Sequence, residues 1–256
     1  MVNANCSICN QNILNINSAI FIPQFKIYIC NTEHNNIIFG KPGRSVSDKI
    51  DKLRREHRSK YKLHILSLIY SLFQENSLEM KNWKKGKYGE VLIGNKLNKL
   101  GLKHNIAVFH DLSLPGSNAN IDHLLIIGNS VFIVDSKNYN GKVKIIKNKK
   151  NSQVQTQLYI GNNDQKRLVE QALYIGNIAK MNFERFGLYP NIINFLCFNN
   201  WKEGVFEGNI EVNNIKIIGQ NLKYLKRYLK KNKENIKPSN KLIAITLKLF
   251  PVKTKF

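Results

Sequence analysis

Apolar positions in the middle of the chain follow first a helical and then a strand periodicity. Residues 88–101 carry apolar side chains at helical spacing, which predicts a helix that ends at Gly101. Residues 105–114, 121–129 and 130–139 are short apolar-rich runs that predict strands, and the turn at 128–130 predicts that the last two form a hairpin. The pattern indicates a helix followed by an antiparallel part of a sheet.

The C-terminal half continues this order of helices and strands. Its expected elements are a strand at 141–148, a polar stretch at 149–163, a helix at 166–186, strands at 191–199 and 214–220, and a basic helix at 221–232. The last segment, 241–256, alternates like a strand but has no predicted place in the sheet.

A long basic helix is expected before this region, at residues 45–76, with Ser47 or Asp48 as its N-cap. A packing helix with a solvated face is the favoured interpretation, and a helix that contacts DNA is the alternative. Its apolar part, Leu63–Phe73, is too short to cross a bilayer. Residues Met1–Asn12 lack the basic start and apolar run of a signal peptide, so a soluble cytoplasmic protein is expected.

The element order predicts an α/β protein with a central sheet flanked by helices. Four parts are expected along the chain: a zinc-ribbon-like module at 1–40, a basic helical linker at 41–84, the α/β domain at 85–235, and a basic C-terminal tail at 236–256.

The chain is strongly basic, with 40 Lys and Arg against 17 Asp and Glu and a net charge of +23 over 256 residues. A surface of this charge favours polyanions, and nucleic acid is the leading partner. The alternative is compositional, because the abundance of Asn, Ile and Lys is typical of an AT-rich genome. No membrane partner is expected.

Three cysteines and one histidine near the N-terminus have the spacing of a metal site. The pattern is Cys6-x2-Cys9-x20-Cys30-x3-His34, with strand character between the two pairs, and it predicts a structural Zn²⁺ site. The alternative is a set of reduced thiols beside a surface histidine. Cys197 lies in an apolar strand far away and is expected to be a core thiol.

Several polar residues occupy positions where the periodicity expects buried ones. Asp135 and Lys137 share one face of a predicted strand, and Asp122 opens the preceding strand. Glu90 and Gln171 lie on the apolar faces of the two predicted helices. Carboxylates that meet in one site repel each other, and a divalent cation such as Mg²⁺ or Mn²⁺ relieves that conflict.

Each of these residues also has an ordinary structural interpretation. Asp135 and Lys137 form a salt bridge at a strand end, Asp122 caps a turn, and Glu90 is an acid favoured near a helix N-terminus. Gln171 by itself carries no signal. Their coincidence around one sheet favours a metal-dependent phosphodiesterase site, with the lysine holding water or stabilising charge on a phosphate.

The motifs GKYGE, IDHLLIIG and VDSKNYNG, followed by VEQAL on the later helix, resemble the NERD, or nuclease-related, domain of the PD-(D/E)xK superfamily. The resemblance covers about residues 85–230 and is strongest at 86–141. It implies a restriction-endonuclease-like core, a mixed sheet flanked by helices. It also implies hydrolysis of DNA phosphodiester bonds, and many nucleases of this fold form homodimers.

The resemblance assigns a role to each of the five residues. Asp122 and Asp135 hold Mg²⁺ or Mn²⁺, Glu90 supports that ion or a second one, Lys137 positions the attacking water, and Gln171 is the glutamine of the later helix. Asp135 stands where the superfamily more often has glutamate. A proline expected before the glutamine is missing, which makes Gln165 a competitor of Gln171.

The sequence therefore predicts a Mg²⁺-dependent deoxyribonuclease, an endonuclease or nickase in DNA processing or defence, with a zinc ribbon that aids DNA engagement. The second hypothesis is a non-catalytic nucleic-acid-binding protein on the same fold. The third is a regulatory module whose ribbon binds protein.

Overall fold

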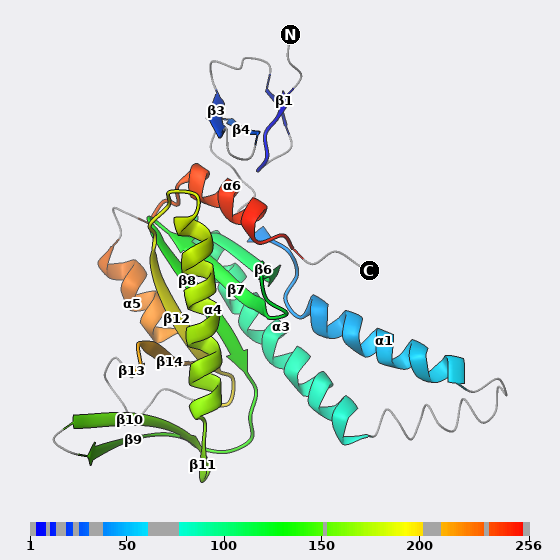
Figure 1. The fold of residues 1–256 in the computed structure, drawn as a ribbon, viewed down its shortest axis with the longest axis vertical. Helices are drawn as coiled ribbons and strands as arrows, with labels where there is room; N and C mark the ends of the chain where they lie inside the picture. The colour runs from blue at the N-terminus through cyan, green and yellow to red at the C-terminus, as the bar shows by residue number, and fades with distance from the viewer. Residues whose placement is uncertain are drawn as a thin grey trace.

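A computed structural model gives the fold (Figure 1). It describes residues 4–8, 11–13, 19–22, 26–30, 38–60, 77–150, 153–201, 211–232 and 236–252.

A mixed seven-stranded sheet forms the centre of the molecule, with the order β13-β14-β12-β8-β7-β6-β5. Its strands are β5 (Ile38–Phe39), β6 (Ala107–Ser113), β7 (Asn120–Ile127), β8 (Ser130–Lys137), β12 (Asn191–Phe198), β13 (Glu211–Val212) and β14 (Ile215–Gly219). The β6, β7 and β8 strands are antiparallel neighbours, whereas β8, β12 and β14 run parallel. The predicted hairpin and the mixed sheet are confirmed.

Helices cover both faces of this sheet (Figure 1). On one face α3 (Leu78–His104) and α5 (Lys223–Lys231) enclose a core that includes Phe132 and Phe195. On the other face α4 (Lys166–Glu184) and α6 (Asn240–Leu249) pack on residues such as Ile133 and Leu196. The alternation of side chains along each strand produces these two separate cores.

The α3 helix is longer than the sequence predicted. It continues through Gly101 to His104 and ends at Asn105, which adopts a left-handed conformation at φ 52°. Gly101 serves packing instead, because a Cβ there would stand 2.6 Å from Cγ2 of Val108 on the sheet. The predicted end of the helix is therefore wrong. The glycine permits close approach and does not cap the helix.

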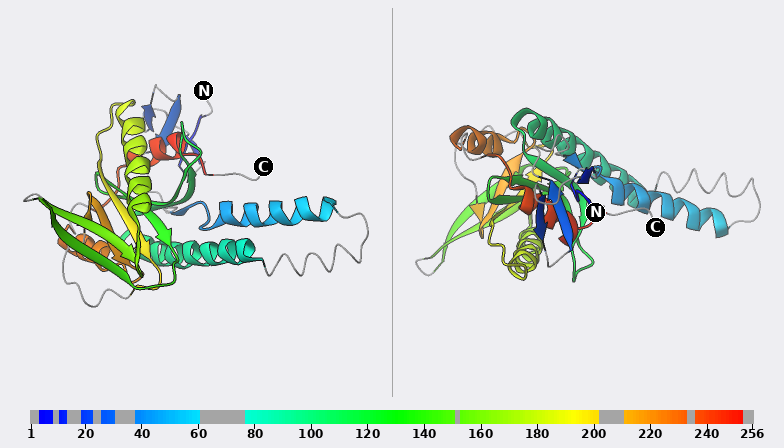
Figure 2. Two further views of the ribbon diagram at one scale, coloured as in Figure 1. Left: turned by 60° about the horizontal axis from the view of Figure 1, so that its bottom comes forward. Right: turned by 90° about the horizontal axis from the view of Figure 1, so that it is seen from above.

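The basic α1 helix (Arg44–Lys60) lies beside the N-terminal part of α3 (Figure 2). It begins at Arg44, so the predicted N-caps Ser47 and Asp48 are wrong. The carboxylate of Asp111, a buried residue of β6, instead accepts from the amide of Ser45 in the first turn. A tertiary contact supplies this cap, and it fixes α1 to the sheet. The apolar segment Leu63–Phe73 lies outside the described residues.

A smaller three-stranded sheet extends beyond the N-terminal end of α4. It consists of β9 (Val143–Lys150), β10 (Gln153–Ile160) and β11 (Asn163–Asp164). The polar stretch expected at 149–163 therefore contains a strand. Leu158 and Ile160 lie on one face of this strand and are buried against α4, but the many polar residues around them concealed this pattern in the sequence.

The C-terminal segment that alternates like a strand is the helix α6. Residues Leu242–Ile245 are all buried, because α6 lies between the main sheet and the N-terminal strands. Burial on all sides removes the helical periodicity on which sequence prediction depends. No helix in the described ranges is long and apolar enough to cross a membrane.

Four short strands form two antiparallel pairs near the N-terminus. The strands are β1 (Ala4–Asn5), β2 (Asn12–Ile13), β3 (Ala19–Ile22) and β4 (Ile27–Cys30). The strand character expected between the two pairs of zinc ligands is thus present. Side chains of this module, among them Cys6 and Ile29, pack into the same core as α6.

Candidate active site

The register of the β7–β8 hairpin places two aspartates side by side. His123 pairs with Val134, so the next position along each strand sets Asp122 opposite Asp135. Oδ2 of Asp122 accepts a hydrogen bond of 3.0 Å from the amide of Ser136. The sequence did not determine this register, and the tertiary structure does.

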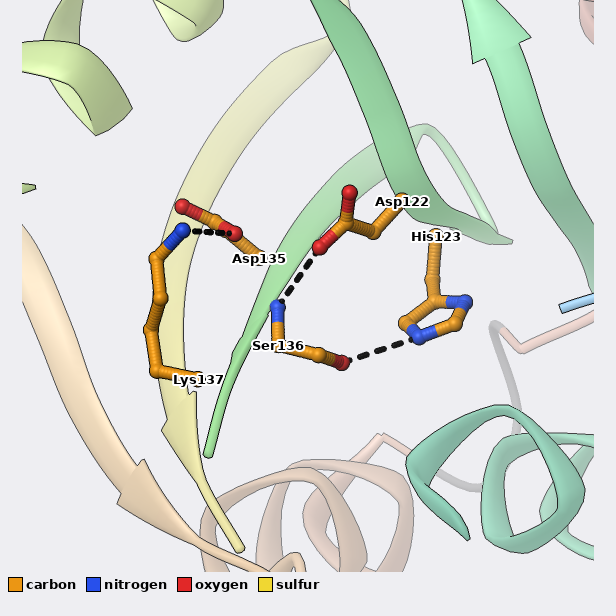
Figure 3. A network of polar contacts seen from close by, with 5 residues as sticks. All are labelled: Asp122, His123, Asp135, Ser136 and Lys137. Atoms are coloured by element: carbon orange, nitrogen blue, oxygen red, sulfur yellow. Dashed lines mark hydrogen bonds and ion pairs between the residues drawn. The ribbon is translucent and has the colours of Figure 1, made fainter. Parts of the chain in front are cut away.

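Lys137 pairs with Asp135 on the same face of β8 (Figure 3). Its Nζ lies 2.7 Å from Oδ1 of Asp135, and the two side chains are 20% and 13% exposed. Their positions at the carboxyl end of β8 follow from the apolar residues before them. Val131 and Ile133 anchor the same face in the core and fix where the two charges project.

The electrostatics of the site centre on Asp122. Although part of the residue stays accessible, its carboxyl group is enclosed by protein. Burial raises the pKa of Asp122 well above its ordinary value, and repulsion from Glu90 and Asp135 raises it further. Lys137 and the Ser136 amide act in the opposite direction without cancelling the effect. Glu90 and Asp135 are therefore each close enough to Asp122 to oppose its ionisation.

Lys137 keeps its proton in this arrangement. Burial alone lowers the pKa of a lysine, but attraction to Asp135 and Asp122 outweighs it and raises the pKa of Lys137. The side chain is therefore an ammonium group at neutral pH. It can hold a water molecule or stabilise an anion, and it is not a base.

Glu90 reaches the site from α3, where it is half-buried. The side-chain Nδ2 of Asn138, just after β8, donates a 2.7 Å hydrogen bond to the backbone carbonyl of Lys85. This contact joins the end of β8 to the turn of α3 that precedes Glu90. The Asn after the Asp-x-Lys pair therefore holds the helix that presents the third carboxylate.

The two glutamine candidates lie at the N-terminal end of α4. Gln171 is exposed, so its predicted place on the apolar face of the helix is wrong. Gln165 precedes the helix, where its side chain donates to the carbonyl of Asn163. No hydrogen bond joins either one to the carboxylates within the described residues. Their assignment stays a prediction.

A buried polar network behind the site was missed by the sequence analysis. Oγ of Ser136 lies 2.9 Å from Nε2 of His123, the two Nδ1 atoms of His123 and His110 are 2.8 Å apart, and Nε2 of His110 lies 2.7 Å from Oδ1 of Asn98. Nε2 of His110 donates to that oxygen, so Nδ1 of a neutral His110 accepts from Nδ1 of His123. Nε2 of His123 is then an acceptor. The Ser136 hydroxyl then donates to His123.

This network connects α3 and three strands through uncharged imidazoles. Burial lowers the pKa of His110 to about 4, and burial followed by repulsion from His110 lowers the pKa of His123 well below its ordinary value. Both histidines are fully buried. The available sequence signal was a histidine at a buried strand position in each of two strands that pair at that level.

Asn199 is a second polar residue that the sequence analysis did not select. It follows β12 at the same edge of the sheet and is only 2% exposed. Neither end of its amide has a hydrogen-bond partner within the described residues. It packs against Gly89 of α3, where an added Cβ would meet its Nδ2 at 2.3 Å.

The donor set suits a hard divalent cation in its chemistry. Carboxylate oxygens are the ligands that Mg²⁺ and Mn²⁺ prefer, and a cation would relieve the repulsion that raises the pKa of Asp122. In the part of the chain that the structure describes, however, no three His, Cys, Asp or Glu side chains lie at metal-ligand spacing. Asp135 pairs with Lys137 instead.

The predicted zinc ligands are described only in part. The sulfur of Cys6 is buried and accepts from the amide of Ile8 at 3.4 Å, and Cys30 ends β4. Cys9 and His34 lie outside the described residues, so the zinc site stays a prediction. Cys197 is fully buried, as the sequence predicted.

The fold is that of an α/β protein, with a mixed sheet flanked by helices and with acids and a lysine at the carboxyl edge of its parallel strands, and it is consistent with a nuclease-like core. In a comparison with known families, residues 85–199, less than half of the chain, match NERD, the nuclease-related domain. This part of the chain is thus similar to a nuclease-related domain. The match includes Glu90, Asp122, Asp135, Lys137 and Gln171.

One relative is an uncharacterized protein of Bacillus anthracis, 39% identical over 84 residues. The alignment covers 30% of this chain and 38% of that protein, so the chain matches less than half the length of this relative. No solved structure matches the chain.

Proposed function

We propose that the protein is a metal-dependent nuclease that hydrolyses DNA phosphodiester bonds, as an endonuclease or nickase of the PD-(D/E)xK type. One observation carries the proposal. Burial raises the pKa of the Asp122 carboxyl group, repulsion from Glu90 and Asp135 raises it further, and Lys137 pairs with Asp135 beside them. Carboxylates held close together repel each other and destabilise the fold, and such groups are typical of a functional site.

The residues that would hold the metal are Asp122 and Asp135, with Glu90 in support. When bound, Mg²⁺ or Mn²⁺ supplies positive charge that polarises a phosphoryl oxygen. The hydrogen bond from the Ser136 amide holds Oδ2 of Asp122, which leaves the other carboxylate oxygen available as a ligand.

Lys137 would act through its charge. Because attraction to Asp135 and Asp122 raises its pKa, its ammonium group can donate to a phosphate oxygen or orient the attacking water. Its 2.7 Å contact with Asp135 would keep that ammonium group beside a phosphate bound at the carboxylates. Gln171 would help to orient that water from α4.

DNA as the substrate is supported by charge. The net charge is +23, and the β9 strand beyond the site presents exposed lysines at 144 and 147, with Lys142 just before it. Phosphates of a polymer would be attracted to this surface over a distance of about 8 Å at physiological salt. DNA processing or defence against foreign DNA is the role that such an enzyme would serve.

Nicking of supercoiled plasmid tests the proposal. The full chain is incubated with plasmid and Mg²⁺ or Mn²⁺, and Asp135→Asn and Lys137→Gln are compared with wild type. Loss of one charge-stabilising group costs about a hundredfold or more in rate, so both variants should leave the plasmid supercoiled. Asp51→Asn makes the same charge change as Asp135→Asn on exposed α1 and should nick like wild type.

Two results would contradict the proposal. One is a wild-type protein that nicks nothing in either metal. The other is an Asp135 or Lys137 variant that nicks as fast as the Asp51 control, because the activity would then come from elsewhere.

The second candidate function is nucleic-acid binding without cleavage. It is favoured by the absence of a metal-ligand cluster among the described residues and by the ion pair that engages Asp135. Such a protein would bind DNA with the expected salt dependence and never cut it, so the same plasmid experiment separates the two functions.

A further inference from the structure

A basic pocket lies between the C-terminal half of α3 and the loop after β14. Its volume is about 520 Å³, and its lining includes four lysines and a histidine but no acidic residue. The lysines are Lys96, Lys99, Lys103 and Lys226, and the histidine is His104. None of the four lysines forms an ion pair within the described ranges.

One of these lysines is held in place by uncharged partners. Nζ of Lys96 donates to the side-chain oxygen of Gln220 at 2.8 Å and to the Gln220 carbonyl at 3.1 Å. Lys96 is half-buried, so its charge is fixed at the pocket wall and is not balanced by a carboxylate. A fixed and uncompensated cation favours an anionic ligand.

The loop that closes the pocket adds two further features. Leu222, the N-cap of α5, is buried at φ 55°, a conformation that bulky residues rarely adopt, and no side chain caps the helix that follows. Oδ1 of Asn221 is buried without a hydrogen-bond partner within the described residues. The uncapped amides of α5 suit an anion, while Asn221 offers a polar group to the rest of a ligand.

The pocket belongs to the same edge of the sheet as the acidic site. Gly219, at the end of β14, is level with Phe198 of β12, which is level with Lys137 of β8. Two strand spacings separate β14 from β8, about 10 Å. Along α3, Lys96 follows Glu90 by six residues, about 9 Å of helix.

We propose that this pocket is a second phosphate-binding site, which holds the backbone of a nucleic acid some nucleotides away from the bond to be cut. Lys99 and Lys103 lie farther along α3, 9 and 13 residues after Glu90, so the pocket's lysines span about 9 to 20 Å of helix from the acidic site. This separation corresponds to about three to six base steps of 3.4 Å. The inference deepens the proposed function and rests on it for the identity of the ligand. A free nucleotide offers the same phosphate chemistry, so the experiment includes it.

Binding measured without cleavage tests the pocket. A fluorescent DNA duplex is titrated with the full chain in EDTA at several salt concentrations, and Lys99→Gln/Lys103→Gln is compared with wild type. Both lysines are exposed, so the fold should be kept. Losing two phosphate contacts should lower the salt slope by about two and weaken binding at 0.1 M salt on the order of tenfold to 50-fold.

The matched control is Lys241→Gln/Lys248→Gln, which removes the same charge from two exposed positions of α6. It should stay within about threefold of wild type. A parallel arm follows thermal stabilisation by ATP. If only the pocket variant loses a saturable effect of ATP while DNA binding is unchanged, the phosphate site stands, with a free nucleotide as its source.

Equal behaviour of the pocket and control variants in both arms would overturn the proposal, as would a wild-type protein that binds neither ligand at low salt. Because EDTA excludes cleavage, the result is independent of nuclease activity. A protein that never nicks plasmid but loses DNA binding in the pocket variant would retain this site and refute only the proposed catalytic function.

Discussion

At the scale of single residues, Asp122 sets the energetics of the site. Its carboxyl group is enclosed by protein and repelled by Glu90 and Asp135, and both effects raise its pKa. A negative charge on this carboxyl group costs the fold free energy, and a bound cation would offset that cost. Removal of the Asp122 charge is therefore expected to stabilise the protein, although the site would lose its function.

Asp122→Asn should therefore increase the free energy of unfolding at pH 7 in EDTA, while it abolishes nicking. The amide keeps an oxygen for the Ser136 hydrogen bond and removes the charge. Urea unfolding followed by circular dichroism measures the change. Asp51→Asn, on the surface, should stay within about 0.5 kcal/mol of wild type, and an Asp122→Asn protein less stable than wild type would refute the account.

At the scale of elements, the packing of α3 against the ends of β8 and β12 positions the site. Gly89 stands where a Cβ would lie 2.3 Å from Nδ2 of Asn199 and 2.8 Å from Cβ of Asn138. Three residues earlier in the same helix, nothing lies within 4 Å of a Cβ built on Gly86. Of the two glycines in the GKYGE motif, only Gly89 is therefore required for close packing of α3.

Alanine at these two positions should have opposite effects. Gly89→Ala should destabilise the protein by about 1 to 3 kcal/mol and impair nicking, because α3 must move away from Asn138 and Asn199. Gly86→Ala should stabilise it by about 0.5 to 1 kcal/mol, since alanine favours a helix. Thermal unfolding of both variants provides the comparison, and equal shifts in the same direction would contradict the close contact.

At the scale of the whole molecule, acid should weaken the fold through the buried histidines. His110 keeps a pKa of about 4 in the folded protein against 6.5 for an exposed imidazole. As pH falls from 6.5 towards 4, His110 becomes protonated in the unfolded chain but stays neutral in the folded protein. The stabilisation present at neutral pH is therefore lost in this window, by up to about 3 kcal/mol from His110.

The free energy of unfolding, measured in urea at pH 7 and pH 4.5, should show this decrease. Asp122 works in the opposite sense, because its raised pKa makes the folded state the better proton acceptor as pH falls. The variant His110→Gln isolates the histidine. It should be less stable than wild type at pH 7 but lose less stability on acidification, and an unchanged pH dependence would exclude His110 as the cause.

The local pattern of the sequence was sufficient for most of the central sheet. Strands β6, β7, β8, β12 and β14 follow from short apolar-rich runs, and β8 presents Asp135 and Lys137 on one face because side chains alternate. Two elements, β10 and α6, were predicted wrongly. The polar strand β10 and the fully buried helix α6 lack the one-sided periodicity that identifies an element, because their neighbours come from distant parts of the chain.

The chemistry divides in the same way. Residue types and spacing, which are local properties, indicated two aspartates, a glutamate and a lysine in a basic protein. Whether they meet depended on the register of β7 against β8 and on the close approach of α3 through Gly89. The histidine network and the basic pocket arise from α3 meeting strands and loops far from it in sequence. Only folding, which sets the distances between such segments, could produce them.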